Sequence, residues 1–226
     1  NPDSDGAVDL LNRLRGRSGI SPVVFDPALS VGATDHARYL DRHDLDTHFQ
    51  TPGRRGFTGV SHADRAMAYG VERDLWELVA PAARSPREAV ASLWDGPYRR
   101  IPLLQPGVGA IGIGTAGPVN VFVLDRRGSG ETSSPGVGEK GVATAWTGSD
   151  APEPSRIHPG WGAAPTGPLL VYARWGRGTE RIRAARASIV DASGRTVPLW
   201  LNHPGNDDAL SNAIVVVPKR PLAKNA

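Results

Sequence analysis

A glycine- and serine-rich segment, RRGSGETSSPGVGEKG at 126–141, divides this sequence into two parts with different hydrophobic patterns. Its composition is typical of a linker, which we place at 127–141. Before it, apolar residues recur at helical spacing in several stretches. After it, short apolar runs alternate with turn residues. The sequence therefore predicts an α+β chain in two domains, one over 1–126 and an all-β one over 142–226.

The first part combines helical and strand patterns. Apolar residues between 5 and 17 have the spacing of an amphipathic helix. Asp26 can cap a second helix that has Pro27 at its first position and ends near residue 43. The glycines that alternate in GVGAIGIG indicate a strand with close backbone packing. Further helices are expected over 61–70 and 86–95, and strands over 75–80, 108–115 and 119–124.

The second part reads as a small β-sandwich. An immunoglobulin-like sandwich usually has about seven strands. Five or six are expected here, so we expect the last strand to be missing from this sequence or to come from another chain. One helical turn near 208–212 is the exception to the β pattern. The strands are expected over 142–146, 169–175, 184–190, 197–201 and 213–217.

Composition excludes several classes of function. The chain has no cysteine, which rules out disulfides, thiolate zinc sites and cysteine nucleophiles. No apolar run reaches the ~18 residues that span a bilayer, so the chain is not expected to be transmembrane. The arginines are dispersed rather than gathered in a stripe, which argues against nucleic-acid binding. The N-terminus lacks a signal peptide, as in a mature secreted protein after cleavage.

Three residues stand out as candidates for chemistry. Glu77 lies inside an apolar strand, WELVA, where a charge is costly unless it is paired. A structural salt bridge and a place in a ligand cleft explain it equally well. His48 lies in a polar loop over 44–60 and is either a solvated histidine or part of the same cleft. Arg99 has a structural pairing with an acid as its simplest explanation.

The order and spacing of these residues resemble the CAP superfamily of cysteine-rich secretory, antigen 5 and pathogenesis-related proteins, in its bacterial secreted branch. The similarity covers roughly residues 5–125. Thr47-His48 resembles the family's Ser-His-Thr site, WELV at 76–79 its Gly-Glu-Asn-Ile, and GPYRR at 96–100 its Ser-Pro-Gly-His-Arg. The resemblance implies a three-layer α-β-α sandwich with a cleft lined by histidine and glutamate. It also implies that the residues after 140 form the small Ig-like β-sandwich often appended in bacterial members.

One position departs from the family pattern. Members of the family bring two histidines and acidic residues together, and some bind a divalent metal there. Arg99 stands where the second histidine is expected, and a guanidinium has no lone pair to give to a metal. The remaining His48, Glu77 and Asp95 are too few for a closed zinc site. We therefore expect no metal and no cofactor, and hypothesise that Arg99 pairs with Glu77 in a degenerate cleft formed by these four residues.

Three functions follow from the resemblance. The first is a secreted or envelope-associated binding protein, whose cleft takes a lipid, a glycan or another envelope component and whose β-sandwich contacts a protein partner. The second is a peptidase-like hydrolase that uses His48 and Glu77 as acid and base. No nucleophile is evident, and activity as an enzyme is the less favoured alternative. The third is a structural role in which the β-sandwich is the working part and the first domain a spacer.

Overall fold

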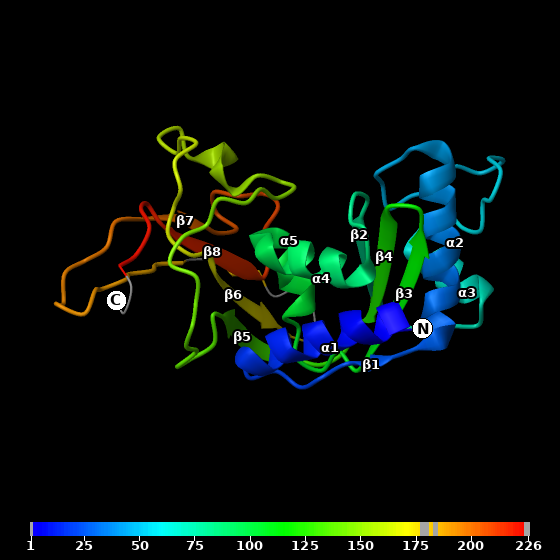
Figure 1. The fold of residues 1–226 in the computed structure, drawn as a ribbon, viewed down its shortest axis with the longest axis horizontal. Coiled ribbons are helices and arrows are strands. Elements are labelled where there is room, and N and C mark those ends of the chain that lie inside the picture. Colours follow the sequence, from blue (N-terminus) through cyan, green and yellow to red (C-terminus); the bar gives the residue numbers. More distant parts are fainter. Residues whose placement is uncertain (1, 177–180, 183–184, 224–226) are drawn as a thin grey trace. The chain divides into compact units, whose positions relative to one another are not determined.

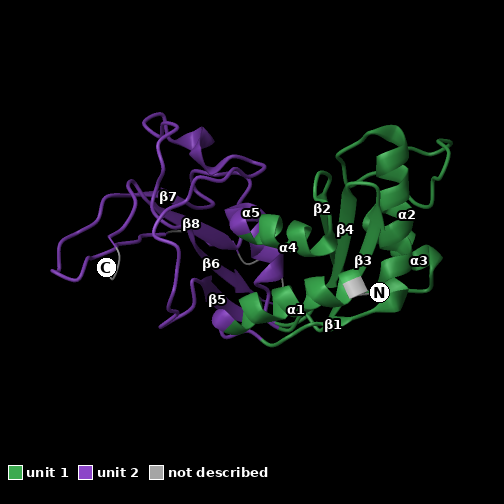
Figure 2. Ribbon diagram, viewed as in Figure 1, with its two compact units in different colours: residues 1–16, 21–94, 107–128 green, residues 17–20, 95–106, 129–226 purple. Residues whose placement is uncertain are grey.

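The computed structural model covers residues 1–226 and describes residues 2–176, 181–182 and 185–223. The chain forms two compact units that are discontinuous in sequence (Figure 2). Unit 1 comprises residues 1–16, 21–94 and 107–128, and unit 2 comprises residues 17–20, 95–106 and 129–226. The strand expected over 184–190 lies partly outside the described residues.

Unit 1 contains a four-stranded sheet in the order β1-β3-β4-β2. β2 and β3 both run antiparallel to β4, while the short β1 runs parallel to β3. The three predicted strands are confirmed to within two residues at either end. The strands are β1 Val24–Phe25, β2 Leu75–Ala80, β3 Ala110–Ala116 and β4 Val119–Asp125.

Helices cover both faces of this sheet and produce three layers. In Figure 1, α2 and α3 lie on one side of the sheet and α1 and α4 on the other. The carboxylate of Asp26 accepts the Ala28 and Leu29 amides and so caps α2, as its Asp-Pro sequence predicts. Ser61 and Asp64 form a capping box that starts α3. The helices are α1 Pro2–Arg17, α2 Pro27–His43, α3 His62–Ala68 and α4 Pro86–Asp95.

One core cluster of unit 1 lies between α2 and the sheet. Leu40 and its neighbours on one face of α2 pack against the valines of β4. Two glycines of β3 allow this close approach, because a Cβ added at Gly112 or Gly114 would lie 2.4 or 2.1 Å from the backbone of α2. The alternating glycines therefore serve close backbone packing, as predicted. This packing fixes α2 against the sheet.

Unit 2 is rich in β structure. Its sheet has the order β5-β6-β8-β7 with every neighbouring pair antiparallel. A short helix, α5, and a 3-10 turn, η1, are the other regular elements among the residues of unit 2 that the structure describes. Their bounds and those of the strands are α5 Pro97–Leu103, β5 Gly130–Ser134, η1 Pro154–Ile157, β6 Leu170–Trp175, β7 Leu199–Asn202 and β8 Ala213–Pro218.

The expected mixed α+β class, with an α-β-α sandwich followed by a β-rich part, is confirmed. Some elements of unit 2 differ from expectation. The segment 127–141, expected to be a linker, contributes β5, and the residues near 208–212 form turns rather than helix. In the described part of the chain, Trp146 and Val190 make only isolated bridges, and the named strands of unit 2 form one sheet. The immunoglobulin-like arrangement of two packed sheets stays a prediction.

Candidate functional site: a buried glutamate shared by arginine and histidine

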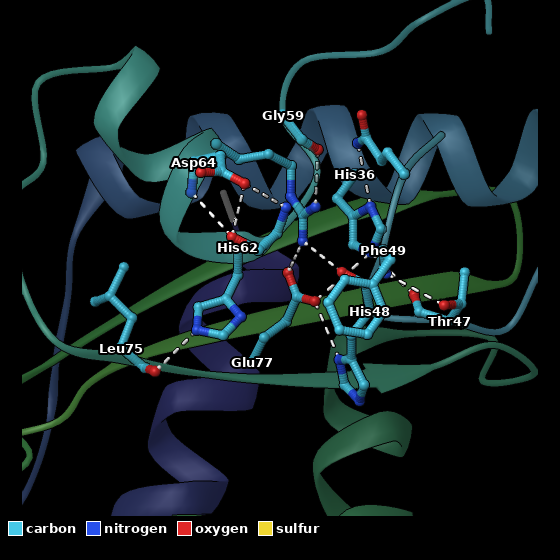
Figure 3. A network of polar contacts seen from close by, with 12 residues as sticks. His36, Thr47, His48, Phe49, Gly59, His62, Asp64, Leu75 and Glu77 are labelled. Carbon is cyan, nitrogen blue, oxygen red and sulfur yellow. Dashed lines mark hydrogen bonds and ion pairs between the residues drawn. The ribbon is translucent and has the colours of Figure 1, made fainter. Parts of the chain in front are cut away.

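Glu77 lies in the middle of β2 with its side chain almost fully buried (Figure 3). Its two carboxylate oxygens have different partners. Oε2 accepts a 2.6 Å hydrogen bond from Nη2 of Arg65, and Oε1 lies 3.1 Å from Nδ1 of His48 and 3.6 Å from Nε2 of His36. Burial acts to raise the pKa of Glu77, but the hydrogen bond with His48 and the charge of Arg65 outweigh it and hold that pKa below its usual value. The carboxylate is therefore ionised at neutral pH.

Arg65 projects from α3 and is itself buried, with 1% of its surface exposed. Besides Glu77, its guanidinium donates to three main-chain carbonyl oxygens of the preceding loop. Nη2 donates to His48 O at 3.2 Å, and Nη1 donates to Gly59 O at 3.3 Å and Val60 O at 3.4 Å. One cation thus joins β2 to both ends of the loop that presents His48.

His36, on α2, is fully buried and is held as a neutral imidazole. The Oε1 atom of Gln50 accepts the Thr58 amide at 2.8 Å, which leaves the amide nitrogen of Gln50 to donate to Nδ1 of His36 at 3.2 Å. Nε2 of His36 therefore carries the proton and donates to Thr47 O at 3.1 Å. Burial lowers the pKa of His36 to about 4, in agreement with this neutral tautomer.

His48 is the accessible member of the group, with 51% of its side chain exposed. Because Glu77 is ionised, Nδ1 of His48 donates to Oε1, and in Figure 3 the other ring nitrogen points away from Glu77. This hydrogen bond raises the pKa of His48 above its usual value, although partial burial acts in the opposite direction. The site therefore presents a half-exposed imidazole whose orientation is fixed by Glu77.

The predicted pairing of Arg99 with Glu77 is wrong. The guanidinium of Arg99 donates from Nε to Asp150 at 2.6 Å, and Arg65 supplies the cation for Glu77. The physical reason is that Asp150 lies at the start of α5, where it also accepts the Tyr98 amide. Arg99 belongs to unit 2, and so does Asp95, whose backbone carbonyl accepts from Arg100.

Sequence reasoning found His48 and Glu77, which the structure brings together, and missed the roles of His36 and Arg65. The one available signal for Arg65 was indirect: a glutamate in an apolar strand needs a cationic partner. Nothing local to the α3 sequence identifies which of the many arginines provides it.

The residues around Glu77 do not fit a divalent metal ion. Among the described residues no three histidine, aspartate or glutamate side chains are arranged to hold one. The Nδ1 lone pair of His36 is occupied by Gln50, and the guanidinium of Arg65 covers Oε2 of Glu77. A fixed positive charge 2.6 Å from the carboxylate also repels a second cation.

A narrow pocket with a volume of about 10 Å³, room for about one water molecule, lies beside Glu77 and Arg65, between α2 and α3. Its remaining walls are mostly small or apolar side chains of α2 and the sheet, with the His62 ring at the edge. Nε2 of His62 is 3.0 Å from the carbonyl oxygen of Leu75.

The solved structures that resemble this chain include two bacterial proteins. One is an extracellular protein containing an SCP domain from Bacillus anthracis str. Ames, 19% identical, with a TM-score of 0.48, covering 54% of this chain and 39% of that one. The other is an outer surface protein from Borrelia burgdorferi, 17% identical, with a TM-score of 0.44, covering 56% of this chain and 95% of that one. This chain therefore spans well under half of the Bacillus protein. No curated protein matches it.

None of the described helices is long and apolar enough to cross a membrane. The model of the cysteine-rich secretory protein family, CAP, matches residues 8–118. The matched range contains all four residues of the buried network and most of the sheet that positions them. Residues 8–118 of this chain therefore form a CAP domain, the domain of the cysteine-rich secretory protein family.

Proposed function

We propose that this chain is a secreted or envelope-associated binding protein whose CAP domain recognises its ligand through His48. The observation that carries the proposal is the hydrogen bond from Nδ1 of His48 to the buried carboxylate of Glu77. It fixes the ring and leaves Nε2 free to bind a ligand. The match to a family described as secretory supports the location.

The loop that carries His48 is preorganised for binding. The Gln50 amide donates to Val60 O at 2.9 Å, and the Thr51 amide donates to the Tyr39 hydroxyl at 3.0 Å. Together with the contacts of Arg65 and His36, these bonds connect the loop to α2 and α3. A ligand that binds such a loop loses little affinity to ordering it.

The surroundings of His48 indicate the chemistry of the ligand. Phe49 is 61% exposed, and Phe57 and Val60 on the same loop are also exposed. The raised pKa of His48 increases its positive charge near neutral pH. A ligand with an anionic or hydrogen-bond-accepting group next to an apolar group suits this combination. Envelope lipids and glycans are the classes we expect, and a protein partner for the β-rich unit is a further expectation.

A hydrolase is the second candidate, because an imidazole oriented by a carboxylate is the arrangement of a general base. Its test is digestion of a peptide library by the purified protein. Cleavage that His48→Ala abolishes would establish this alternative, and peptides left intact would exclude it for that substrate class.

Native mass spectrometry and lipidomics of the purified protein test the binding proposal. We expect a co-purifying lipid or glycan that His48→Ala loses. His203→Ala, in unit 2, is the matched control and should retain it. A ligand kept equally by both variants would contradict recognition through His48.

The binding site is proposed to work without a metal, as the donor chemistry around Glu77 supports. Elemental mass spectrometry after gentle purification provides the check. Zinc at stoichiometric occupancy would overturn this part of the proposal.

A further inference from the structure

The oxygen atoms around Arg65 form a site for a cation. Its guanidinium receives one carboxylate oxygen, from Glu77, and three main-chain carbonyl oxygens, from His48, Gly59 and Val60. In the described structure these four acceptors come from β2 and from both ends of one loop. Oxygen ligands drawn from separate segments are what a bound metal ion commonly uses to hold a loop.

The backbone of the loop is shaped to bring its carbonyls to this position. A Cβ added to Gly59 would lie 2.7 Å from the backbone nitrogen of Arg65 and 2.9 Å from the Cβ of Asp64. Only glycine allows the loop to approach the start of α3 this closely. The approach places Gly59 O within reach of Nη1 of Arg65.

We propose that Arg65 is a built-in cation that takes the place of a metal ion in this CAP domain. Its planar fork reaches four oxygens at once, and no metal can enter while it is there. Arg65 also positions His48, because it holds the His48 carbonyl and occupies Oε2 of Glu77 while His48 uses Oε1. This inference stands independently of the ligand proposal, since it concerns the loop itself.

The alternative is that Arg65 is an ordinary buried ion-pair partner of Glu77. The two explanations differ in what happens when the side chain is removed. Arg65→Ala leaves an oxygen-lined cavity of guanidinium shape. If the cavity is a cation site, a free guanidinium ion fills it and restores the loop. If Arg65 is only the ion-pair partner of Glu77, the loop carbonyls do not hold the added ion, and guanidinium then acts on the loop solely as a weak denaturant.

Hydrogen–deuterium exchange of the full chain tests this directly. In Arg65→Ala we expect the loop amides between 48 and 60 to exchange at least about tenfold faster than in the unmodified protein. Guanidinium chloride far below denaturing concentrations should restore most of that protection, and equal sodium chloride should not. Absence of rescue would overturn the proposal.

Two further variants keep the test decisive. Arg73→Ala removes another arginine of unit 1, which pairs with Asp26 and Asp125, and guanidinium should not slow exchange of its loop. If Arg65→Ala does not fold, Arg65→Lys replaces it. A compact ammonium can pair with Glu77 but cannot span four oxygens. The amides near Gly59 and Val60 should then lose protection, and protection equal to that of the unmodified protein would contradict the built-in cation.

Discussion

At the scale of single residues, the site is organised by the cost of burying one carboxylate. An unpaired charge at Glu77 would be expelled from the apolar strand or neutralised. Arg65 makes the charge tolerable, His36 contributes a neutral N–H nearby, and His48 uses the remaining oxygen. The orientation of the exposed His48 is therefore set by the buried groups around Glu77.

Replacing the carboxylate tests this arrangement. Glu77→Gln keeps the volume of the side chain but leaves Arg65 buried without its anion, so we expect a loss of about 3–5 kcal/mol in the free energy of unfolding. Glu88→Gln, which breaks an exposed pair with Arg84, should cost far less. Urea unfolding of both variants provides the measurement. Equal losses would contradict a buried ion pair at Glu77.

The lowered pKa of His36 predicts that the folded protein is less stable in acid. Its pKa is lowered from 6.5 to about 4 in the fold, so between these values the unfolded chain binds more protons and stability falls as pH falls. The expected loss is on the order of 3 kcal/mol from pH 7 to pH 4. Above pH 6.5 the full stabilisation from the neutral His36 is present.

The contribution of His48 to stability has the opposite dependence on pH. Its raised pKa adds stability below pH 6.5, and that stability is lost as pH rises through the folded value. The pH dependence of His36 should therefore be measured by urea unfolding in a His48→Ala background. A second substitution, His36→Asn, should flatten the slope between about pH 4 and 6.5. An unchanged slope would show that His36 is not the responsible group.

At the scale of elements, short sequence patterns were enough to predict most helices and strands of unit 1. Asp26 and Pro27 mark the start of α2, and short apolar runs mark the three longer strands of the sheet. These features depend on neighbours in sequence. α5 and β5 were missed because long-range contacts define them: Asp150 accepts the amide near the start of α5, and β5 exists by pairing with β6.

The difference between local and long-range determinants also explains which site residues could be predicted from the sequence. His48 and Glu77 could be found from their residue types and order. Arg65 could not, since its role depends on α3 packing beside β2. The family template directed attention to Arg99 instead, whose partner Asp150 lies 51 residues later in the chain.

The contact of β3 with α2 gives a prediction for an element. Gly114→Ala would place a Cβ 2.1 Å from the carbonyl carbon of Ala33, so the helix must shift. Overpacking of this kind typically costs about 1–3 kcal/mol, and a lower Tm is expected. Gly109→Ala, with open space around the added Cβ, is the matched control and should leave Tm nearly unchanged. Similar Tm values for both variants would contradict the close packing.

At the scale of the whole molecule, the chain contributes to each unit more than once. Residues 95–106 belong to unit 2 although the CAP match includes them. Within unit 2, Tyr98 hydrogen-bonds to Asp207, and Arg99 and the Tyr98 amide bind the fully buried carboxylate of Asp150. The compact units therefore do not divide at the glycine-rich segment alone.

This organisation predicts how fragments behave. A fragment of residues 129–226 lacks α5, which leaves Asp150 with neither Arg99 nor the Tyr98 amide. We expect it to show no cooperative thermal unfolding by circular dichroism. A fragment of residues 95–226 retains these partners and should be markedly more ordered. Equal order in the two fragments would show that α5 is dispensable to unit 2.

Nitrogen–proton NMR of the histidine side chains, recorded before and after addition of one equivalent of zinc, tests the central claim most directly. A neutral His36 protonated at Nε2 and a His48 protonated at Nδ1 are predicted, with neither signal moved by zinc. Zinc-dependent shifts of both rings would show that they act as metal ligands and would contradict a cleft whose cation is Arg65.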